Sequence, residues 1–194
     1  RRLIEYEPDG CFIAEFDGVP VGTVSTTSYG TKLAWIGMML VLPEYRRRGI
    51  ASQLIQKSID YLCERGVTCV KLDATPSGQP LYEQLGFLAE WGFQRWEREG
   101  ENVPTFSLDG DLSTQLVAMD EVAFGADRSC WLLSVASDCR VFTLQSTFGM
   151  LRPGSGATYL GPVVSEDPSE VASIVGEMLL IAEGRVFWGI PKGH

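Results

Sequence analysis

The amino-acid sequence predicts an α/β (α+β) protein with a central mixed sheet flanked by helices, followed by a second, diverged domain of the same kind. Three observations lead to this prediction: a strand hairpin near the start, a strand–helix–strand crossover after it, and a fainter recurrence of that order in the second half. The composition, 45% hydrophobic and 21% charged over 194 residues, is that of a globular chain long enough for one large domain or two small ones.

The first predicted elements are a strand hairpin and a long central strand. Residues 11–27, CFIAEFDGVPVGTVSTT, alternate apolar and polar side chains around Asp17-Gly18, a pair typical of a tight turn. The next segment, KLAWIGMMLVL at residues 32–42, is apolar enough for a central strand buried on both faces. Pro43 ends it.

A helix and a second parallel strand are predicted next. Apolar side chains recur at helical spacing up to the stop at Gly66; they are Ala51, Leu54, Ile55, Ile59, Leu62 and Cys63. Residues 67–74, VTCVKLDA, are β-branched and apolar, so strand, helix and strand make a right-handed crossover with two parallel strands. LYEQL at 81–85 predicts a short helix, and FLAEWGFQRWERE at 87–99 predicts the last strand of the first domain.

The second half repeats this order, so we expect two domains, residues 1–100 and 101–194. Past Pro104 the patterns predict a helix, two strands, a second helix and a final strand; these cover 112–124, 139–147, 157–164, 171–182 and 185–191.

A weak internal repeat relates the two halves. When Pro162 is aligned with Pro43, Gly184 nearly superposes on Gly66. A chance match of two common elements is the alternative interpretation.

Charge and composition limit the kinds of partner. The formal net charge is −9, and residues 101–194 carry 5 Lys or Arg against 12 Asp or Glu. Such a chain repels a phosphate backbone, which argues against nucleic acid and mildly favours a cationic small molecule. No apolar run approaches the roughly 18 residues that would cross a membrane.

Cysteine and histidine usage bears on compartment and metal binding. The five cysteines are odd in number and form no C-x-x-C pair, which predicts reduced, mostly buried thiols in a cytoplasmic protein. The single histidine, His194, supplies neither a metal site nor a catalytic imidazole, so no metal is predicted.

The most informative segment is LVLPEYRRRGIASQLI, in which three arginines directly precede a helix. The start of a helix carries a partial positive charge and favours anions, so a negative ligand is expected among these cations. Gly49 and Ala51 leave the backbone open, and consecutive N–H groups from Arg46 to Ala51 can form an anion nest that would cradle a pyrophosphate. The G-x-G-x-x-G and GK[ST] patterns of nucleotide folds are absent, so neither a dinucleotide nor Mg-ATP is implied.

PEYRRRGIA with its flanking strand and helix resembles the acyl-CoA signature of the GNAT superfamily of N-acyltransferases, and LYEQLGF resembles that family's second signature. The resemblance covers roughly residues 10 to 95. LDATPSGQPLYEQLGF also resembles a branch of two-domain bacterial GNAT proteins whose C-terminal half is a degenerate GNAT-like domain. The family's first strand and two opening helices are not visible, so a truncated N-terminus is expected.

The resemblance implies acetyl-CoA as co-substrate and assigns a set of binding residues. Leu40 and Val41 would pair with pantetheine as if it were an added strand, and the N–H of Met39 would polarise the thioester carbonyl. The pyrophosphate would lie on the backbone at the start of the helix, at Arg46, Arg47, Arg48, Gly49, Ile50, Ala51 and Ser52.

Tyr82 is the candidate catalytic residue that the resemblance implies. A phenol with a reference pKa of about 10 can return a proton to the departing CoA thiolate at neutral pH. Packing, or contact with the cofactor sulfur, is the alternative role. The usual Asn of the family's second motif is Thr75 here, which leaves cofactor contacts at that position open.

A general base is harder to assign. The strand at residues 32–42 carries no Glu or Asp where relatives often have one. Water could relay the amine proton, and Asp73 and Asp127 are possible carboxylates, although a solvated or capping role suits each of them better.

The second half lacks the arginines and the glycine that make the first half a candidate for pyrophosphate binding. The same alignment puts Ser165, Glu166, Asp167 and Pro168 in place of the arginines and Gly49, so this copy would repel pyrophosphate and is expected to bind no CoA. Its predicted role is to close the acceptor pocket or to form a homodimer interface.

The predicted function is transfer of an acetyl group from acetyl-CoA to a primary amine of a small molecule. A non-catalytic acyl-CoA binding or sensing module, suggested by the missing base, is one alternative. A protein-lysine acetyltransferase is another, because the acidic second half could attract a basic peptide.

Overall fold

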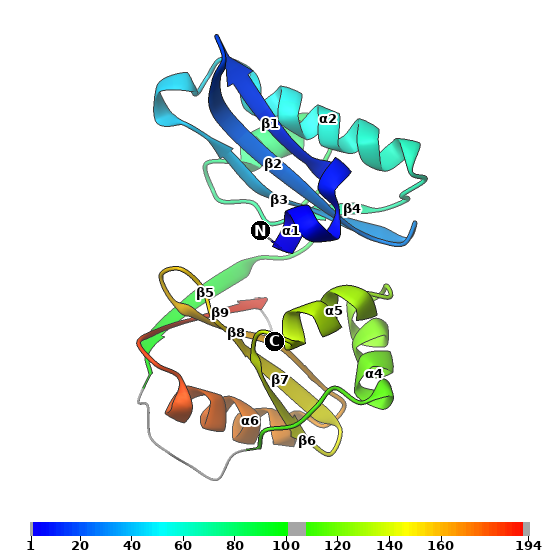
Figure 1. Ribbon diagram of the computed structural model, residues 1–194, viewed down its shortest axis with the longest axis vertical. Coiled ribbons are helices and arrows are strands. Elements are labelled where there is room, and N and C mark those ends of the chain that lie inside the picture. The colour runs from blue at the N-terminus through cyan, green and yellow to red at the C-terminus, as the bar shows by residue number, and fades with distance from the viewer. Residues whose placement is uncertain (1, 101–107, 192–194) are drawn as a thin grey trace. The chain divides into compact units, whose positions relative to one another are not determined.

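The computed structural model describes residues 2–100 and 108–191, so Pro104 and His194 lie outside the described residues. The chain divides into two compact units, Arg1–Ala89 and Glu90–His194 (Figure 1). Each unit has its own sheet, and each is described by itself.

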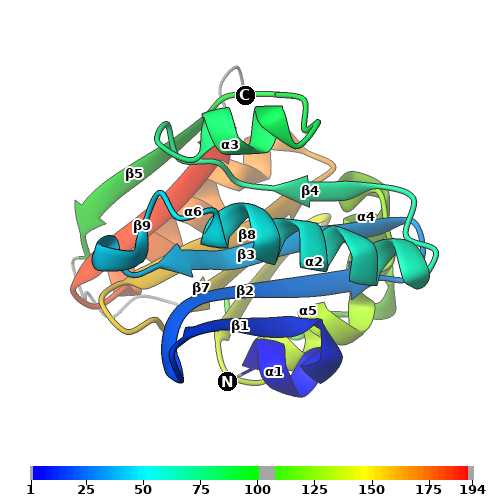
Figure 2. The ribbon, with the colours of Figure 1, turned by 90° about the horizontal axis from the view of Figure 1, so that it is seen from above.

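The first unit is a four-stranded sheet in the order β1-β2-β3-β4. Its elements are α1 (Arg2–Tyr6), η1 (Pro8–Gly10), β1 (Cys11–Phe16), β2 (Val19–Tyr29), β3 (Leu33–Val41), η2 (Pro43–Tyr45), α2 (Ile50–Glu64), β4 (Val70–Leu72) and α3 (Gln79–Gln84). β1, β2 and β3 run antiparallel, and α2 leads across the sheet to β4, which pairs parallel to β3 (Figure 2). The predicted hairpin and the predicted crossover to a parallel strand are confirmed.

The apolar side of α2 forms the core of this unit. Leu54, Ile55 and Leu62 pack against side chains of β2 and β3, in a cluster that also contains Val24, Ala34 and Ile36. The helix approaches β2 closely at Gly22, where a Cβ atom would lie 3.2 Å from Leu54 Cδ1 and 3.0 Å from the Leu40 carbonyl oxygen. A side chain at Gly22 would therefore push the start of α2 away from the sheet.

β3 separates from β4 about halfway along its length. It pairs with β4 only from Ala34 to Ile36. Beyond that point its register with β2 shifts between Thr23 and Ser25, and Met38 has a φ of 51°. Such a bulge bends a strand and increases its twist. Residues 37–41 of β3 consequently have no strand on their β4 side within the described residues.

This departure also limits how much of β3 is buried. Leu33, Ala34 and Ile36 are buried, but Met38 and Leu40 are 57% and 59% exposed. The prediction of a strand buried on both faces therefore holds only for the half of β3 that has β4 beside it.

The second unit contains a five-stranded sheet in the order β5-β9-β8-β7-β6. Its elements are β5 (Phe93–Glu99), α4 (Thr114–Phe124), α5 (Ser129–Ala136), β6 (Arg140–Leu144), β7 (Thr147–Arg152), β8 (Thr158–Ser165), α6 (Pro168–Ile181) and β9 (Arg185–Pro191). α6 packs on Phe142, Leu160 and Val186, while α4 and α5 enclose a second cluster with Phe148 and Met150. A buried bidentate ion pair, Arg128 to Asp120 at 2.7 Å, links α4 to α5.

Two boundaries differ from the sequence prediction. β5 pairs along its whole length with β9, so the division falls between Ala89 and Glu90 instead of at residue 100. The predicted strand at 139–147 is two strands with a turn between them, and α5, which follows α4 directly, has no counterpart in the prediction.

The two units share an order of connections. In each, an antiparallel three-strand meander is followed by a helix that leads to a parallel strand: β1-β2-β3, α2 and β4 in the first, β6-β7-β8, α6 and β9 in the second. The register shift also recurs, between Gly149 and Leu151 of β7, opposite Leu160 and Val163 of β8. Pro162 therefore lies inside a bulged strand and does not correspond to Pro43, which follows its strand.

Candidate functional site

The chain bends before α2. The predicted run of free N–H groups from Arg46 to Ala51 is wrong at its first member, because the Arg46 N–H donates to the Pro43 carbonyl oxygen at 3.3 Å. Pro43 opens η2, and the chain then turns through Arg47, with a φ of 60°, and Gly49, with a φ of 80°. Glycine suits the N-cap position because that left-handed conformation strains any side chain. We call residues 46–52 the phosphate loop. Its residues are exposed or half-buried, so the bend is open to a ligand.

In the part of the chain that the structure describes, no side chain caps this helix. Gly49 makes no side-chain cap bond, and the first turn holds no acidic residue. The first N–H groups of any helix lack partners within the helix. Those of Ile50, Ala51 and Ser52 meet no acceptor among residues 2–100 and 108–191. Donors aligned in this way at a helix start form an anion-binding site.

The three arginines of the loop have separate tasks. Arg46 Nε donates a hydrogen bond to the Val41 carbonyl oxygen at 3.0 Å, which attaches the loop to the end of β3. The Arg48 guanidinium lies over the rings of Phe16 and Tyr45, 5.5 and 5.3 Å from their centroids. Arg47 is exposed and, in the part of the chain that the structure describes, none of the three pairs with a carboxylate.

The free edge of β3 lies directly before this loop. The Leu42 N–H donates to the Val21 carbonyl of β2 at 2.9 Å, so by the alternation of a strand the main-chain groups of Val41 point to the opposite edge. Met39 is half-buried and lies next to Met38 in the bulge of β3. Leu40 instead pairs with Thr23 on β2 and can offer a ligand its exposed side chain.

Tyr82 lies on α3 and is half-buried against the core of the first unit. Its ring meets Phe87 edge-on, with 6.1 Å between centroids. Burial raises the pKa of the Tyr82 hydroxyl above its usual value of 10.0, so the phenol holds its proton across the neutral range. A protonated phenol that no protein acceptor engages among the described residues is suited to donate a proton to a ligand.

Thr75, at the position of the family's usual Asn, is part of the turn that begins α3. Its Oγ1 accepts a hydrogen bond from the Gly78 N–H at 3.3 Å and lies 3.1 Å from Ser77 Oγ. The hydroxyl therefore stabilises the local turn.

The two candidate general bases, Asp73 and Asp127, have different surroundings. Asp73 lies in the exposed segment that follows β4. Asp127 accepts a hydrogen bond from the Ser129 N–H at 2.8 Å at the start of α5, and its bonds to Ser129 hold its pKa below the usual range. Asp127 is a capping residue, as the sequence suggested, and a carboxylate with a lowered pKa is a weaker base.

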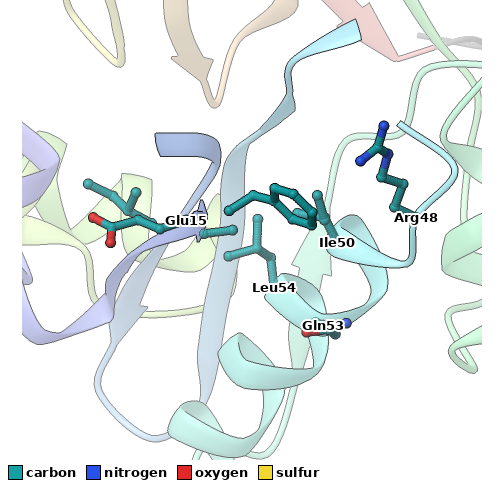
Figure 3. Close-up of a pocket in the computed structure, with 8 residues that line it drawn as sticks. Glu15, Arg48, Ile50, Gln53 and Leu54 are labelled. Atoms are coloured by element: carbon teal, nitrogen blue, oxygen red, sulfur yellow. The ribbon is translucent and has the colours of Figure 1, made fainter. Parts of the chain in front are cut away.

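A pocket of about 390 Å³ lies on the β1 side of the phosphate loop. Residues 13–16 of β1, Arg48, and Ile50, Gln53 and Leu54 of α2 line it. Figure 3 shows Arg48 at one end, Glu15 at the other, and Ile50 and Leu54 between them. Sequence reasoning missed the link between Phe16 and the loop, since an aromatic residue before a hairpin turn looks like an ordinary strand residue.

The second unit closes the corresponding helix start. Only Glu166 and Asp167 separate β8 from α6, so nothing there matches residues 42–49. Asp167 is the N-cap and accepts from the Ser169 N–H at 2.9 Å, while the buried Glu170 accepts from Thr147 Oγ1 at 2.6 Å. Asp167 occupies an N–H group that an anion would need, and the negative charges of Asp167 and Glu170 would repel an anion at this helix start.

Within residues 2–100 and 108–191, no three His, Cys, Asp or Glu side chains gather in a way that could hold a metal ion. In the same ranges none of the helices has both the length and the apolar character that spanning a membrane requires.

Comparison with known families identifies the first unit. Residues 1–87 match the family model described as "Acetyltransferase (GNAT) family". An uncharacterized N-acetyltransferase of Archaeoglobus fulgidus is 32% identical over 106 residues, which are 52% of this chain and 70% of that protein. The uncharacterized N-acetyltransferase YitH of Bacillus subtilis is 27% identical over 177 residues, 84% of this chain and 62% of YitH. The N-alpha-acetyltransferase MAK3 of Arabidopsis thaliana is 37% identical over 94 residues, 45% of this chain and 50% of MAK3.

Solved structures extend the similarity over both units. A crystal structure from Pyrococcus horikoshii, named as a "putative acetyltransferase", matches 98% of this chain and 66% of its own with a TM-score of 0.84 and 26% identity. A second such structure, from Thermoplasma acidophilum, matches 98% of this chain and 76% of its own with a TM-score of 0.62 and 15% identity, which shows a shared fold. The chain thus spans about 62% and 50% of the length of the first two curated relatives.

Proposed function

Because this chain belongs to the GNAT family of acetyltransferases, we propose that it transfers an acetyl group from acetyl-CoA to a primary amine of a small molecule. One observation carries the proposal: the uncapped start of α2 directly follows the free edge of β3. A free strand edge followed along the chain by an anion site fits a ligand that has an extended, amide-containing arm and a diphosphate.

The diphosphate of CoA would lie on the phosphate loop. The N–H groups of Ile50, Ala51 and Ser52 would donate to its oxygens, and the exposed Arg47 would add a positive charge. The proposal retains all seven residues of the loop in this site. Arg46 and Arg48 would act mainly by fixing the shape of the loop.

The pantetheine arm would extend along the free edge of β3. The Val41 N–H would pair with the arm there, since the Val41 carbonyl oxygen already accepts from Arg46 Nε; Leu40 would offer an apolar side chain, and the Met39 N–H would donate to the thioester carbonyl oxygen. Such a donor stabilises the negative charge that develops on that oxygen, and one donor is typically worth about 10²- to 10³-fold in rate.

The reaction needs a free amine and a protonated leaving group. The amine nitrogen would attack the thioester carbon, a C–N bond would form, and the C–S bond would break. The amine proton would pass to water or to the exposed Asp73, and Tyr82 would give its proton to the departing CoA thiolate. No covalent enzyme intermediate is required.

An acyl-CoA sensor is the second candidate. The observation that favours it is β3 itself, which carries no Asp or Glu from Leu33 to Val41 and so offers no base at the free edge. A protein-amine acceptor is a third. The relatives that are N-alpha-acetyltransferases match less than half of this chain, so their acceptor class does not decide that of this protein.

CoA release from acetyl-CoA, measured with a panel of small amines, amino sugars and lysine peptides, separates these functions. The proposal expects turnover with at least one small amine well above hydrolysis in buffer. Tight acetyl-CoA binding with hydrolysis alone would favour the sensor, and release only with peptides would favour a protein acceptor.

The second unit would be a diverged, CoA-free copy of the first. Its order of strands and its closed helix start support this proposal, and its acidic surface would serve to attract a cationic acceptor or to form a homodimer. The expectation of mostly buried thiols is wrong, because Cys63, Cys69 and Cys130 are exposed and Cys11 and Cys139 are half-buried. All five are free thiols, which suits a reducing compartment, so we propose that the protein is cytoplasmic.

A further inference from the structure

Two side chains attach the phosphate loop to the strands around it. Arg46 holds it to the end of β3 through the Val41 carbonyl. Arg48 holds it to the far side of the sheet, because Phe16 is the last residue of β1, which is separated from β3 by β2. The Phe16 and Tyr45 rings lie 5.6 Å apart, so the guanidinium meets both rings of one aromatic pair.

A pocket lies beside this contact. Residues of β1, Arg48 and the first turns of α2 line this pocket of about 390 Å³ (Figure 3). Arg47 and Gly49 both have positive φ values, 60° and 80°. A segment with a pocket on one side and a non-glycine residue in the left-handed region depends on the contacts at its rim to hold its shape.

We propose that Phe16 and Tyr45 are positioning residues for CoA: by holding Arg48, they keep the N–H groups at the start of α2 in the geometry that binds the diphosphate. In this proposal neither ring contacts CoA itself. Because a cation–π contact lowers the cost of ordering the loop before binding, its loss appears as weaker binding. The inference rests on the proposed function.

The test replaces Phe16 and compares two acyl donors. Phe16→Leu should weaken acetyl-CoA binding about 3- to 30-fold by calorimetry, the range that such a contact accounts for. Turnover at saturating acetyl-CoA should not change. The KM for acetyl-pantetheine, which has no diphosphate, should not change either, and Phe16→Tyr should restore acetyl-CoA affinity because it keeps the ring.

Phe12→Leu is a matched control. Phe12 lies on the same strand, and its ring meets Lys57 Nζ at 5.8 Å and Tyr61 at 5.8 Å, away from the loop. It should leave acetyl-CoA affinity unchanged. If Phe16→Leu does not fold, Tyr45→Leu removes the second ring of the pair and should weaken acetyl-CoA binding in the same selective way.

Three results would overturn the inference: unchanged acetyl-CoA affinity in Phe16→Leu, an equal loss with both donors, or the same loss in Phe12→Leu. Wild-type protein that binds no acetyl-CoA would overturn the proposed function together with this inference. Wild-type binding that both aromatic variants retain would overturn the inference alone.

Discussion

Arg46, Arg47 and Arg48 are adjacent in the sequence but have three different environments. The first bonds the end of β3, the third lies on two aromatic rings, and the second is exposed. Three cations before a helix start are unfavourable when all of them point at the helix. The structure relieves this conflict by turning two of the guanidinium groups to other partners, and in the proposed function the exposed Arg47 is the one that would meet the diphosphate.

Tyr82→Phe tests the proposed acid. It should lower turnover by on the order of 10²-fold, the usual contribution of a general acid, with little change in acetyl-CoA affinity. Since burial raises the pKa of Tyr82 above 10.0, ionisation of this group should not reduce turnover below pH 10. Steady-state kinetics from pH 6 to pH 10 and calorimetry measure both effects.

The same pKa shift gives a control on stability. A raised pKa in the folded protein means that the group's contribution to stability is complete below pH 10 and is lost as the pH rises above that value. Tyr82→Phe should remove this part of the alkaline destabilisation. Full turnover in Tyr82→Phe would contradict the acid role and leave packing as its task.

At the scale of elements, α2 and α6 differ in how their N-termini are capped. α2 follows an eight-residue connection, begins with Gly49 and has no acidic residue in its first turn. α6 follows β8 almost at once, is capped by Asp167 and carries Glu170 in its first turn. A helix that satisfies its own N–H groups has no donors left for an anion, so only α2 offers a site.

Ala51→Glu should give α2 a helix start like that of α6. The new carboxylate would occupy the first-turn donors and repel a diphosphate, so acetyl-CoA binding should be lost in calorimetry. Ala51→Gln, which has nearly the same size and no charge, should retain more affinity. Equal affinity of Ala51→Glu and wild type would remove the phosphate loop from the site. Gly49→Glu should act in the same direction, with added strain at a φ of 80°.

At the scale of the whole molecule, two units share a connection order but not a ligand site. The first has the phosphate loop and the free edge of β3; the second lacks residues that match the loop. The structural match to the Pyrococcus horikoshii protein covers 98% of this chain and so includes residues of both units.

Calorimetry should therefore find one acetyl-CoA per chain. The Ala51→Glu chain should bind none, because the second unit offers no substitute. A stoichiometry near two, or binding that remains in Ala51→Glu with half the wild-type stoichiometry, would show that the second unit binds CoA after all.

Short-range patterns made much of the first unit predictable. The alternation around Asp17-Gly18 and the helical spacing from Ala51 to Cys63 depend on neighbours within a few residues, and both predictions are confirmed. The placement of β5 was not predictable, because its residues form a strand in either unit and only pairing with β9 assigns it to the second. Pro162 was misaligned for a similar reason: the bulge that contains it is a property of the β7–β8 pair.

The sequence by itself determined the family, through the resemblance of its motifs to the GNAT signatures. It also determined the position of the helix start and the glycine and arginines that surround it, since these follow from local composition and spacing. Tertiary structure alone decided that β3 leaves β4 after Ile36, that Arg48 lies on Phe16 and Tyr45, and that α6 closes its own N-terminus. Each of these depends on contacts between residues distant in the chain. Such contacts depend on how elements pack, and a linear pattern does not record that packing.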